Sequence, residues 1–286
     1  MSQHEFDSLV PPQGFSRREF LVTSLGAGFA LATQPVAAQT AIVTDAEGLL
    51  AGEVKVPVSD GELLAYRVAP QGKDKAPVIL LISEIFGAHE YIRDTARRLA
   101  KLGYFVIAPE LFARVGDPRK IASIAEIIEK ISSKTPDATV LSDLDASVQW
   151  AAVQGADTSR LAITGFCWGG RITWLYAAHN PRLKAAVAWY GRLIGEKTEN
   201  SPRHPVDIAM DLKAPVLGLY GAADTGISLE SVDQMRAALA QAAPKNPAAK
   251  ACQFEVYPDA PHAFHADYRA TYREGPAKDG WEKCIA

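Results

Sequence analysis

The stretch "GFCWGG" (165–170) lies between an apolar run, "RLAIT" (160–164), and a helical pattern, "GRITWLYAAH" (170–179). It sets Cys167 between two bulky aromatic residues and places glycines on both sides, where they ease a sharp change in backbone direction. Two interpretations are open at this point. Either the thiol is buried in the core and unreactive, as cysteines often are, or the chain bends there to hold the sulfur in a functional site.

Short apolar runs alternate with helical patterns on both sides of this stretch. A turn at Asp60-Gly61 joins two runs as a hairpin, and the later aliphatic runs suit strands buried on both faces. The strands are expected at 53–58, 63–70, 77–83, 104–109, 160–164, 183–191, 215–221 and 251–258. The helices are expected at 89–103, 137–154, 170–179 and 228–242, and a last one begins at 276. This order predicts an α/β fold: one domain with a mostly parallel, doubly wound sheet flanked by helices.

The segment 110–135 is less regular. It begins as a loop, and isoleucines then mark one helical stripe, at Ile121, Ile124, Ile127, Ile128 and Ile131. Charged residues fill the rest of that pattern, so the stripe indicates core or lid packing.

Composition narrows the class of partner. The 286 residues are 48% hydrophobic and 22% charged, with a formal net charge of -3. These values are ordinary for a soluble globular protein and give no sign of binding to polyanions, so nucleic acid is not expected as a partner.

The first forty residues follow a different pattern. A polar lead ends in Arg17-Arg18 within "SRREFL", an apolar run extends from Phe20 to Ala32, and small residues follow at 36–38. This order is typical of a secretory signal, and the paired arginines resemble a twin-arginine export signal. The apolar run is shorter than the roughly 20 residues that span a bilayer, so no stable membrane span is expected. We expect residues 1–38 to be removed after Ala38, and residues 39–286 to be the mature domain, in the periplasm or exported.

The glycines and the strand-to-helix setting of Cys167 match a nucleophile elbow, G-x-S-x-G, with cysteine in place of serine. In that arrangement an acid and then a histidine follow the nucleophile along the chain. Asp224 directly follows the strand expected at 215–221, and His262 follows the one at 251–258. All three positions fall at the carboxyl ends of strands, where sites gather in open α/β sheets.

Each of these residues has a plain structural interpretation when taken alone. Asp224 suits a turn or helix cap, and His262 suits an ordinary loop. With His265 and Asp267, His262 would instead suggest a metal site, but neither an HExxH nor a CxxC motif accompanies them, so no metal is expected. Their joint spacing favours a Cys-His-Asp triad.

A fourth group follows the strand at 77–83. Glu84 comes just before Ile85, at the position whose loop supplies one N–H group of an oxyanion hole in such folds, and Trp168 would supply the other. On its own, Glu84 suits a solvated loop equally well.

The motifs "SEIFG" (83–87), "GFCWGG", "GAAD" (221–224) and "PHAFHADYR" (261–269) together resemble the dienelactone hydrolase family, also called carboxymethylenebutenolidases. The resemblance spans about residues 50–286. It implies an α/β-hydrolase fold, no cofactor, and hydrolysis of an enol-lactone. It further implies Cys167 as nucleophile, His262 as base and acid, Asp224 as the group orienting His262, and Glu84 as a carboxylate controlling ionisation of the thiol.

The chain departs from the family where the substrate carboxylate would bind. The family places an arginine four residues after the histidine, and Ala266 stands there. Arg269 and Arg119 are the candidate replacements, with surface charge as the alternative. A general carboxylesterase or thioesterase is the nearest alternative function, and a non-catalytic binding or redox-sensing protein is a more distant one. Two other cysteines, Cys252 and Cys284, are either a disulfide pair or, as the plainer interpretation, unpaired.

Overall fold

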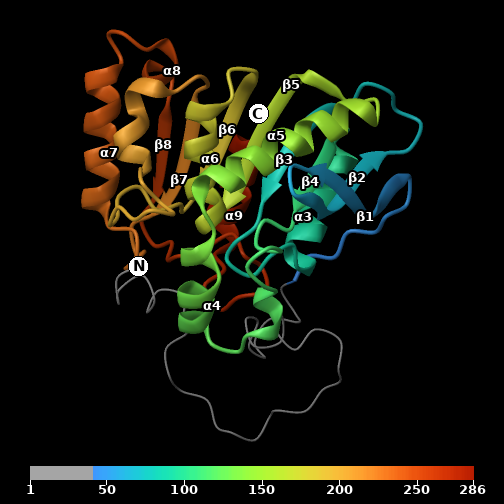
Figure 1. The fold of residues 1–286 in the computed structure, drawn as a ribbon. Helices are drawn as coiled ribbons and strands as arrows, with labels where there is room; N and C mark the ends of the chain where they lie inside the picture. The colour runs from blue at the N-terminus through green and yellow to red at the C-terminus, as the bar shows by residue number, and fades with distance from the viewer. Residues whose placement is uncertain (1–40) are drawn as a thin grey trace, which may run out of the picture.

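Strands and helices alternate along the chain to build one eight-stranded sheet (Figure 1). The structure is a computed structural model that describes residues 41–286. The expected signal, with its paired arginines and its cleavage point after Ala38, lies outside the described residues. The strands are β1 (Leu49–Val58), β2 (Gly61–Pro70), β3 (Pro77–Ile82), β4 (Phe105–Pro109), β5 (Asp157–Phe166), β6 (Leu183–Trp189), β7 (Val216–Gly221) and β8 (Gln253–Tyr257).

The sheet order is β1-β2-β4-β3-β5-β6-β7-β8. The hairpin strands β1 and β2 are antiparallel, and β2 pairs antiparallel with β4. All remaining pairs are parallel. The carboxyl ends of β3, β5, β6, β7 and β8 therefore meet at one edge. The predicted fold class, a mostly parallel α/β-hydrolase sheet flanked by helices, is confirmed.

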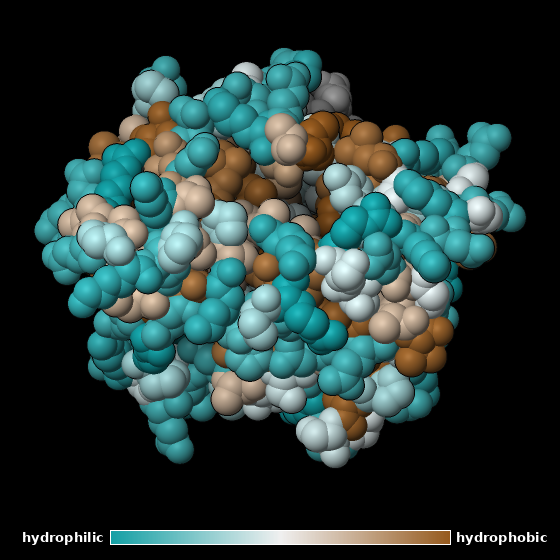
Figure 2. All heavy atoms as spheres, turned by 90° about the horizontal axis from the view of Figure 1, so that it is seen from above, coloured by the Kyte–Doolittle hydropathy of each residue, from teal (hydrophilic) through white to brown (hydrophobic). Residues whose placement is uncertain are grey.

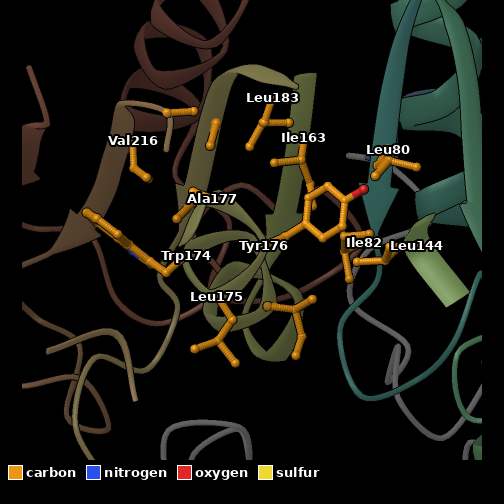
Figure 3. Close-up of a cluster of buried hydrophobic side chains, with 14 of the residues drawn as sticks. Leu80, Ile82, Leu144, Ile163, Trp174, Leu175, Tyr176, Ala177, Leu183 and Val216 are labelled. Atoms are coloured by element: carbon orange, nitrogen blue, oxygen red, sulfur yellow. The ribbon is translucent and has the colours of Figure 1, made fainter. Parts of the chain in front are cut away.

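Helices cover both faces of the sheet. They are α3 (Glu90–Lys101), α4 (Ile124–Lys130), α5 (Asp137–Val153), α6 (Trp168–His179), α7 (Leu229–Ala242), α8 (Pro247–Lys250) and α9 (Glu274–Ile285). Side chains of α5, α6 and α7 form one core with the sheet, and those of α3 and α9 belong to the core on the other face. Figure 3 shows the first core around α6, where Trp174 and Tyr176 pack among aliphatic strand residues such as Ile163.

The segment 110–135 forms a small apolar cluster of its own beside the carboxyl edge of the sheet. Its helical turns are η1 (Pro118–Lys120), α4 and η2 (Ser132–Lys134), and α4 has only seven residues. Ile127 and Ile131 from the predicted stripe pack with Phe112 and with Ile85 and Phe86 from the loop after β3. The stripe thus packs over the loop that precedes α3, with two of its five isoleucines buried and three half-buried. Figure 1 shows α4 projecting beyond that edge of the sheet.

Two short elements differ from the sequence-based expectation. Between the strands expected at 183–191 and 215–221, where no helix was expected, lies the 3₁₀ segment η3 (Pro205–Asp211), and α8 likewise stands where no helix was expected. In each element the first residue is a proline, which directly follows the N-cap residue His204 in η3 and Asn246 in α8. Such pieces are too short to show a helical period, so periodicity does not reveal them.

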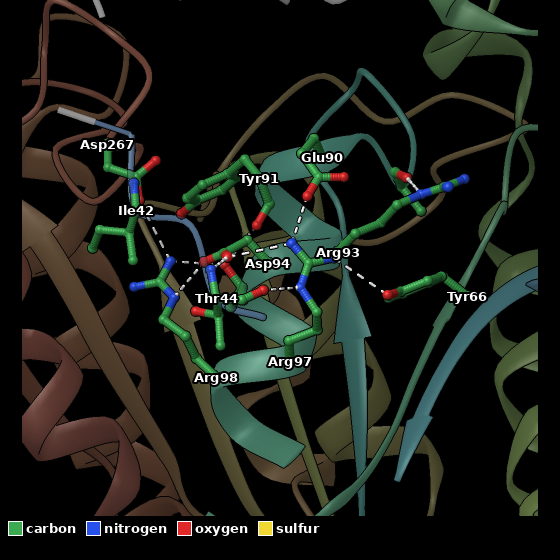
Figure 4. A network of polar contacts seen from close by, with 12 residues as sticks. Ile42, Thr44, Tyr66, Glu90, Tyr91, Arg93, Asp94, Arg97, Arg98 and Asp267 are labelled. Atoms are coloured by element: carbon green, nitrogen blue, oxygen red, sulfur yellow. Dashed lines mark hydrogen bonds and ion pairs between the residues drawn. The ribbon is translucent and has the colours of Figure 1, made fainter. Parts of the chain in front are cut away.

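A polar network fixes α3 to neighbouring segments (Figure 4). Arg97 contacts Asp94 and Glu90 on its own helix, and its Nε donates to the Thr44 carbonyl at 2.7 Å. Arg98 lies 3.6 Å from Asp267, in the loop after β8. α3 is therefore anchored both to the start of the described chain and to the loop that carries His262.

The surface seen from above is mostly hydrophilic, with apolar side chains in smaller groups (Figure 2). Within residues 41–286, no helix combines the length and the apolar character needed to cross a membrane.

Candidate active site

Cys167 sits at the sharp turn between β5 and α6. Its backbone has φ 55° and ψ -113°, a conformation that costs a non-glycine residue about 1–3 kcal/mol. The turn is fixed by hydrogen bonds from the Cys167 N–H to the Trp189 carbonyl at 3.0 Å and from the Gly170 N–H to the Cys167 carbonyl at 3.0 Å. The thiol is half-buried rather than enclosed in the core.

Close backbone packing explains two of the glycines at this turn. A Cβ on Gly165 would lie 2.4 Å from the Gly169 carbonyl oxygen, and a Cβ on Gly169 would lie 2.5 Å from the Ile82 carbonyl oxygen. Real Cβ atoms do not approach backbone so closely, so a side chain at Gly165 would force α6 away from β5, and one at Gly169 would force it away from β3.

Asp224 and His262 meet at the carboxyl ends of β7 and β8. His262 Nδ1 lies 2.7 Å from Asp224 Oδ2, and both side chains are buried. The other carboxylate oxygen of Asp224 accepts hydrogen bonds from the Gly226 N–H at 2.8 Å and the Ile227 N–H at 3.0 Å. Because an ionised carboxylate only accepts, Nδ1 carries the hydrogen and Nε2 is left to interact with the thiol.

His262 Nε2 is buried and makes no hydrogen bond of regular geometry within residues 41–286. Burial alone would lower the pKa of His262, but the negative charges of Asp224 and Cys167 outweigh it and raise the pKa to about 10. The imidazole is therefore suited to hold a proton taken from the thiol. Cys167, His262 and Asp224, predicted from the sequence as a group, are brought together by the fold.

The two residues expected to supply the N–H groups of an oxyanion hole also lie near Cys167. Ile85 and Trp168 line the same cavity as Cys167 and His262. In the described part of the chain their backbone N–H groups donate no hydrogen bond. Backbone donors without a protein acceptor are suited to bind the oxygen of a tetrahedral intermediate.

Glu84 is not among the residues that line the cavity. Its side chain is 1% exposed, and Oε2 is 3.0 Å from His89 Nε2 and 3.0 Å from the Tyr268 hydroxyl. Burial would raise the pKa of Glu84, but the hydrogen bond and charge of His89 are the main influences that lower it below its usual value. Neither His89 nor Tyr268 was singled out from the sequence.

A cavity of about 340 Å³ has Cys167 and His262 on its wall. Apolar residues, including Ile128 and Ile227, and polar residues from 132–134 and 196–204 line it. Its volume falls in the range of about 300–1,000 Å³ typical of small-molecule sites. The basic residues on its wall are Lys134, Arg171 and Arg192.

The two arginines expected to bind a substrate carboxylate do not line this cavity. Arg119 contacts Asp117 at 2.8 Å and Glu110 at 3.1 Å, so its charge is matched locally. Arg269 is buried and lies over the Phe86 ring, 5.8 Å from its centroid. Of the cations that do line the cavity, Arg171 is bound at 2.7 Å by both carboxylate oxygens of Asp137.

The remaining expected groups lie apart from one another. His265 Nδ1 is 2.6 Å from the Tyr91 hydroxyl, whereas Asp267 accepts from the Ile42 N–H, so neither faces His262 as a shared ligand set. Among residues 41–286 no three His, Cys, Asp or Glu side chains are grouped to hold a metal ion. Cys252 and Cys284 are both free thiols, so the disulfide alternative is wrong in this structure.

This fold, with a cysteine at its elbow and a histidine held by an aspartate, is that of an α/β hydrolase. Residues 63–286 match the Dienelactone hydrolase family. The chain belongs to that family, which makes it a hydrolase of lactones or esters.

Close relatives support the assignment over almost the whole chain. A Methylorubrum extorquens protein named "Putative carboxymethylenebutenolidase" is 58% identical over 277 residues, covering 96% of this chain and 93% of the relative. One of the same name from Salmonella typhimurium is 53% identical, covering 93% and 96%. A Klebsiella pneumoniae crystal structure titled "Putative Dienelactone Hydrolase" is 55% identical, covers 83% of this chain and 97% of that one, and has a TM-score of 0.80.

Proposed function

We propose that the chain hydrolyses an enol-lactone or small carboxylic ester through an acyl-thioester on Cys167. The observation that carries this proposal is the placement of His262, held at Nδ1 by Asp224 and presenting Nε2 to the thiol side of the elbow. A thiol needs such a base, because the thiolate is the nucleophile and a free cysteine has a pKa near 8.5.

The reaction proceeds in two halves. The Cys167 thiol gives its proton to His262, and the thiolate attacks the carbonyl carbon. The carbonyl oxygen, now negative, is held by the N–H groups of Ile85 and Trp168. A carbon–sulfur bond has formed, the ring or ester carbon–oxygen bond breaks, and the leaving oxygen takes the proton from His262. Water, deprotonated by His262, then attacks the thioester and releases the acid and the thiol.

Hydrolysis of defined substrates tests this proposal. We expect turnover of an enol-lactone and of 4-nitrophenyl acetate, and a rapid acid quench should trap protein heavier by one acyl group, with the added mass on the peptide containing Cys167. Thioesters and esters with and without a free carboxylate separate a lactonase from a general esterase or thioesterase. A protein that binds these compounds without turnover, or that acylates elsewhere, would refute the proposal.

We also propose that the protein is exported to the periplasm through the twin-arginine route. Support comes from the paired arginines, the short apolar run and the small residues before position 39. Replacing Arg17-Arg18 with two lysines should leave full-length precursor in the cytoplasm, as measured by fractionation and by the mass of the chain. Unchanged export of the lysine variant would contradict this route.

A further inference from the structure

The loop after β8 turns sharply directly after His262. Ala263 has φ 59°, a backbone angle that is unfavourable for a residue other than glycine. The Ala266 N–H donates to the Ala263 carbonyl at 3.0 Å and closes the turn, which carries His265 into the interior, where it is 3% exposed. Because a strained turn persists only where its surroundings hold it, the contacts of His265 bear on the position of His262.

The ring of His265 packs against the residues that support the elbow. It stacks on Phe166, which directly precedes Cys167 at the end of β5, with the ring centroids 5.2 Å apart and the planes at 24°. Its centroid lies 4.4 Å from that of Trp189 at the end of β6, whose carbonyl accepts the Cys167 N–H. Trp281 of α9 stacks on it as well, at 5.9 Å. His265 therefore links its own turn to the two strand ends that fix Cys167.

Tyr91 on α3 fixes the orientation of this ring. Its hydroxyl oxygen is 2.6 Å from His265 Nδ1, and both side chains are buried. Burial raises the pKa of Tyr91 well above its usual value and lowers the pKa of His265 well below its own, so the hydroxyl keeps its proton and the imidazole is neutral. A neutral imidazole has one acceptor nitrogen, and Nδ1 is suited to accept from this hydroxyl. The Tyr91 ring also packs edge-on against Phe166, with the centroids 5.4 Å apart.

His265 takes no part in the reaction itself. It does not line the cavity, and in the proposed mechanism only His262 exchanges a proton with the thiol. That exchange needs the sulfur and His262 Nε2 within hydrogen-bond reach, and a displacement of about 1 Å can cost about 10²-fold in rate. The turn after β5 carries the sulfur, whereas the loop after β8 carries the imidazole. A side chain that belongs to one of these segments and packs on the other can set their separation.

We propose that His265 is a positioning residue that sets the separation between the Cys167 sulfur and His262 Nε2. Its ring supports the strand ends beside the sulfur, its backbone belongs to the turn that begins directly after His262, and the hydrogen bond with Tyr91 keeps the ring in place. The inference rests on the proposed function in one respect, the assignment of Cys167 and His262 as the reacting pair. A residue that only filled the core would affect the stability of the fold and not the rate of the folded protein.

Two measurements on the folded protein test this role: hydrolysis of 4-nitrophenyl acetate, and alkylation of Cys167 by iodoacetamide at pH 6–7. We expect His265→Leu to lower kcat/KM by about 10–100-fold, because the proton transfer is impaired. Alkylation should slow by about threefold or more, since the attraction between the imidazolium and the thiolate falls as they separate. Peptide masses assign the label to Cys167, and burial, which raises the pKa of Cys252 and of Cys284 to about 11, keeps those two thiols slow.

Two further variants separate the ring from its hydrogen bond. His265→Phe keeps a ring against Phe166 but leaves the buried Tyr91 hydroxyl without this acceptor, which is costly for a buried donor. Tyr91→Phe removes that donor. The variant that carries both changes should therefore be faster in both measurements than His265→Phe alone, a rescue that independent effects do not give. These variants carry the test if His265→Leu does not fold.

Phe254→Leu is the matched control for a loss of aromatic packing. The Phe254 ring stacks on that of Trp174 at 5.7 Å and packs against the core on the other face of the sheet. Its replacement should lower the melting temperature and leave both measured rates unchanged.

Unchanged rates in folded His265→Leu would overturn the proposal, as would an equal loss in Phe254→Leu. A double variant no faster than His265→Phe would overturn it too, because the hydrogen bond with Tyr91 would then not hold the ring. Alkylation needs no turnover, so these outcomes are distinct from a failure of the proposed hydrolysis.

Discussion

Replacement of Cys167 by alanine should lower kcat/KM for an ester substrate by about 10⁴-fold or more, because the covalent route is lost with the sulfur. The oxyanion donors are backbone groups of Ile85 and Trp168, so they persist in the variant and leave only residual catalysis. The acyl adduct should disappear from the mass spectrum. Steady-state rates and quenched mass spectra measure both effects.

Two controls show whether the loss is chemical. Cys252→Ala removes a half-buried thiol whose sulfur donates to the Ala248 carbonyl and which does not line the cavity, and it should leave the rate unchanged. Cys167→Ser keeps a hydroxyl of similar shape in the strained backbone and should fold with a similar melting temperature, while remaining far slower than the thiol. Undiminished turnover in Cys167→Ala would exclude this residue as nucleophile.

The elbow was predictable from sequence because its signals are local. An apolar strand, three glycines and a helical pattern lie within twenty residues, and each reflects sterics that act over a few neighbours. Asp224 and His262 were identified because each follows a strand, and the carboxyl ends of parallel strands share one edge. The structure shows their side chains 2.7 Å apart, a distance no spacing rule gives.

The surroundings of Glu84 were not predictable in the same way. Tyr268 reaches it across 184 positions of sequence, and His89 was only the first residue of the helix expected at 89–103. Which arginines reach the cavity also depends on ion pairs: Glu110 and Asp117 hold Arg119 away from it, whereas Arg171, held by Asp137 from 34 positions earlier, lies on the cavity wall. Which side chains contact Glu84 and which arginines line the cavity depends on how the elements pack together. The composition of one segment does not predict these contacts.

Asp224→Asn should reduce kcat/KM by about 10²–10⁴-fold while leaving the fold intact. The asparagine oxygen can still accept from the Gly226 and Ile227 N–H groups, but its NH₂ group would face His262 Nδ1. The imidazole would then place its hydrogen on Nε2, where it cannot take the proton of the thiol. Initial rates and thermal melting measure the two parts of this expectation.

The same substitution should change the ionisation of the site in a defined direction. The negative charge of Asp224 helps to raise the pKa of His262 to about 10, so its removal lowers that pKa and reduces the imidazolium available to pair with a thiolate. Alkylation of Cys167 at pH 6–7 should therefore slow. Asp259→Asn, an exposed change in the same loop as His262, is the matched control and should alter neither rate. Wild-type turnover and alkylation in Asp224→Asn would mean that the carboxylate does not orient the histidine.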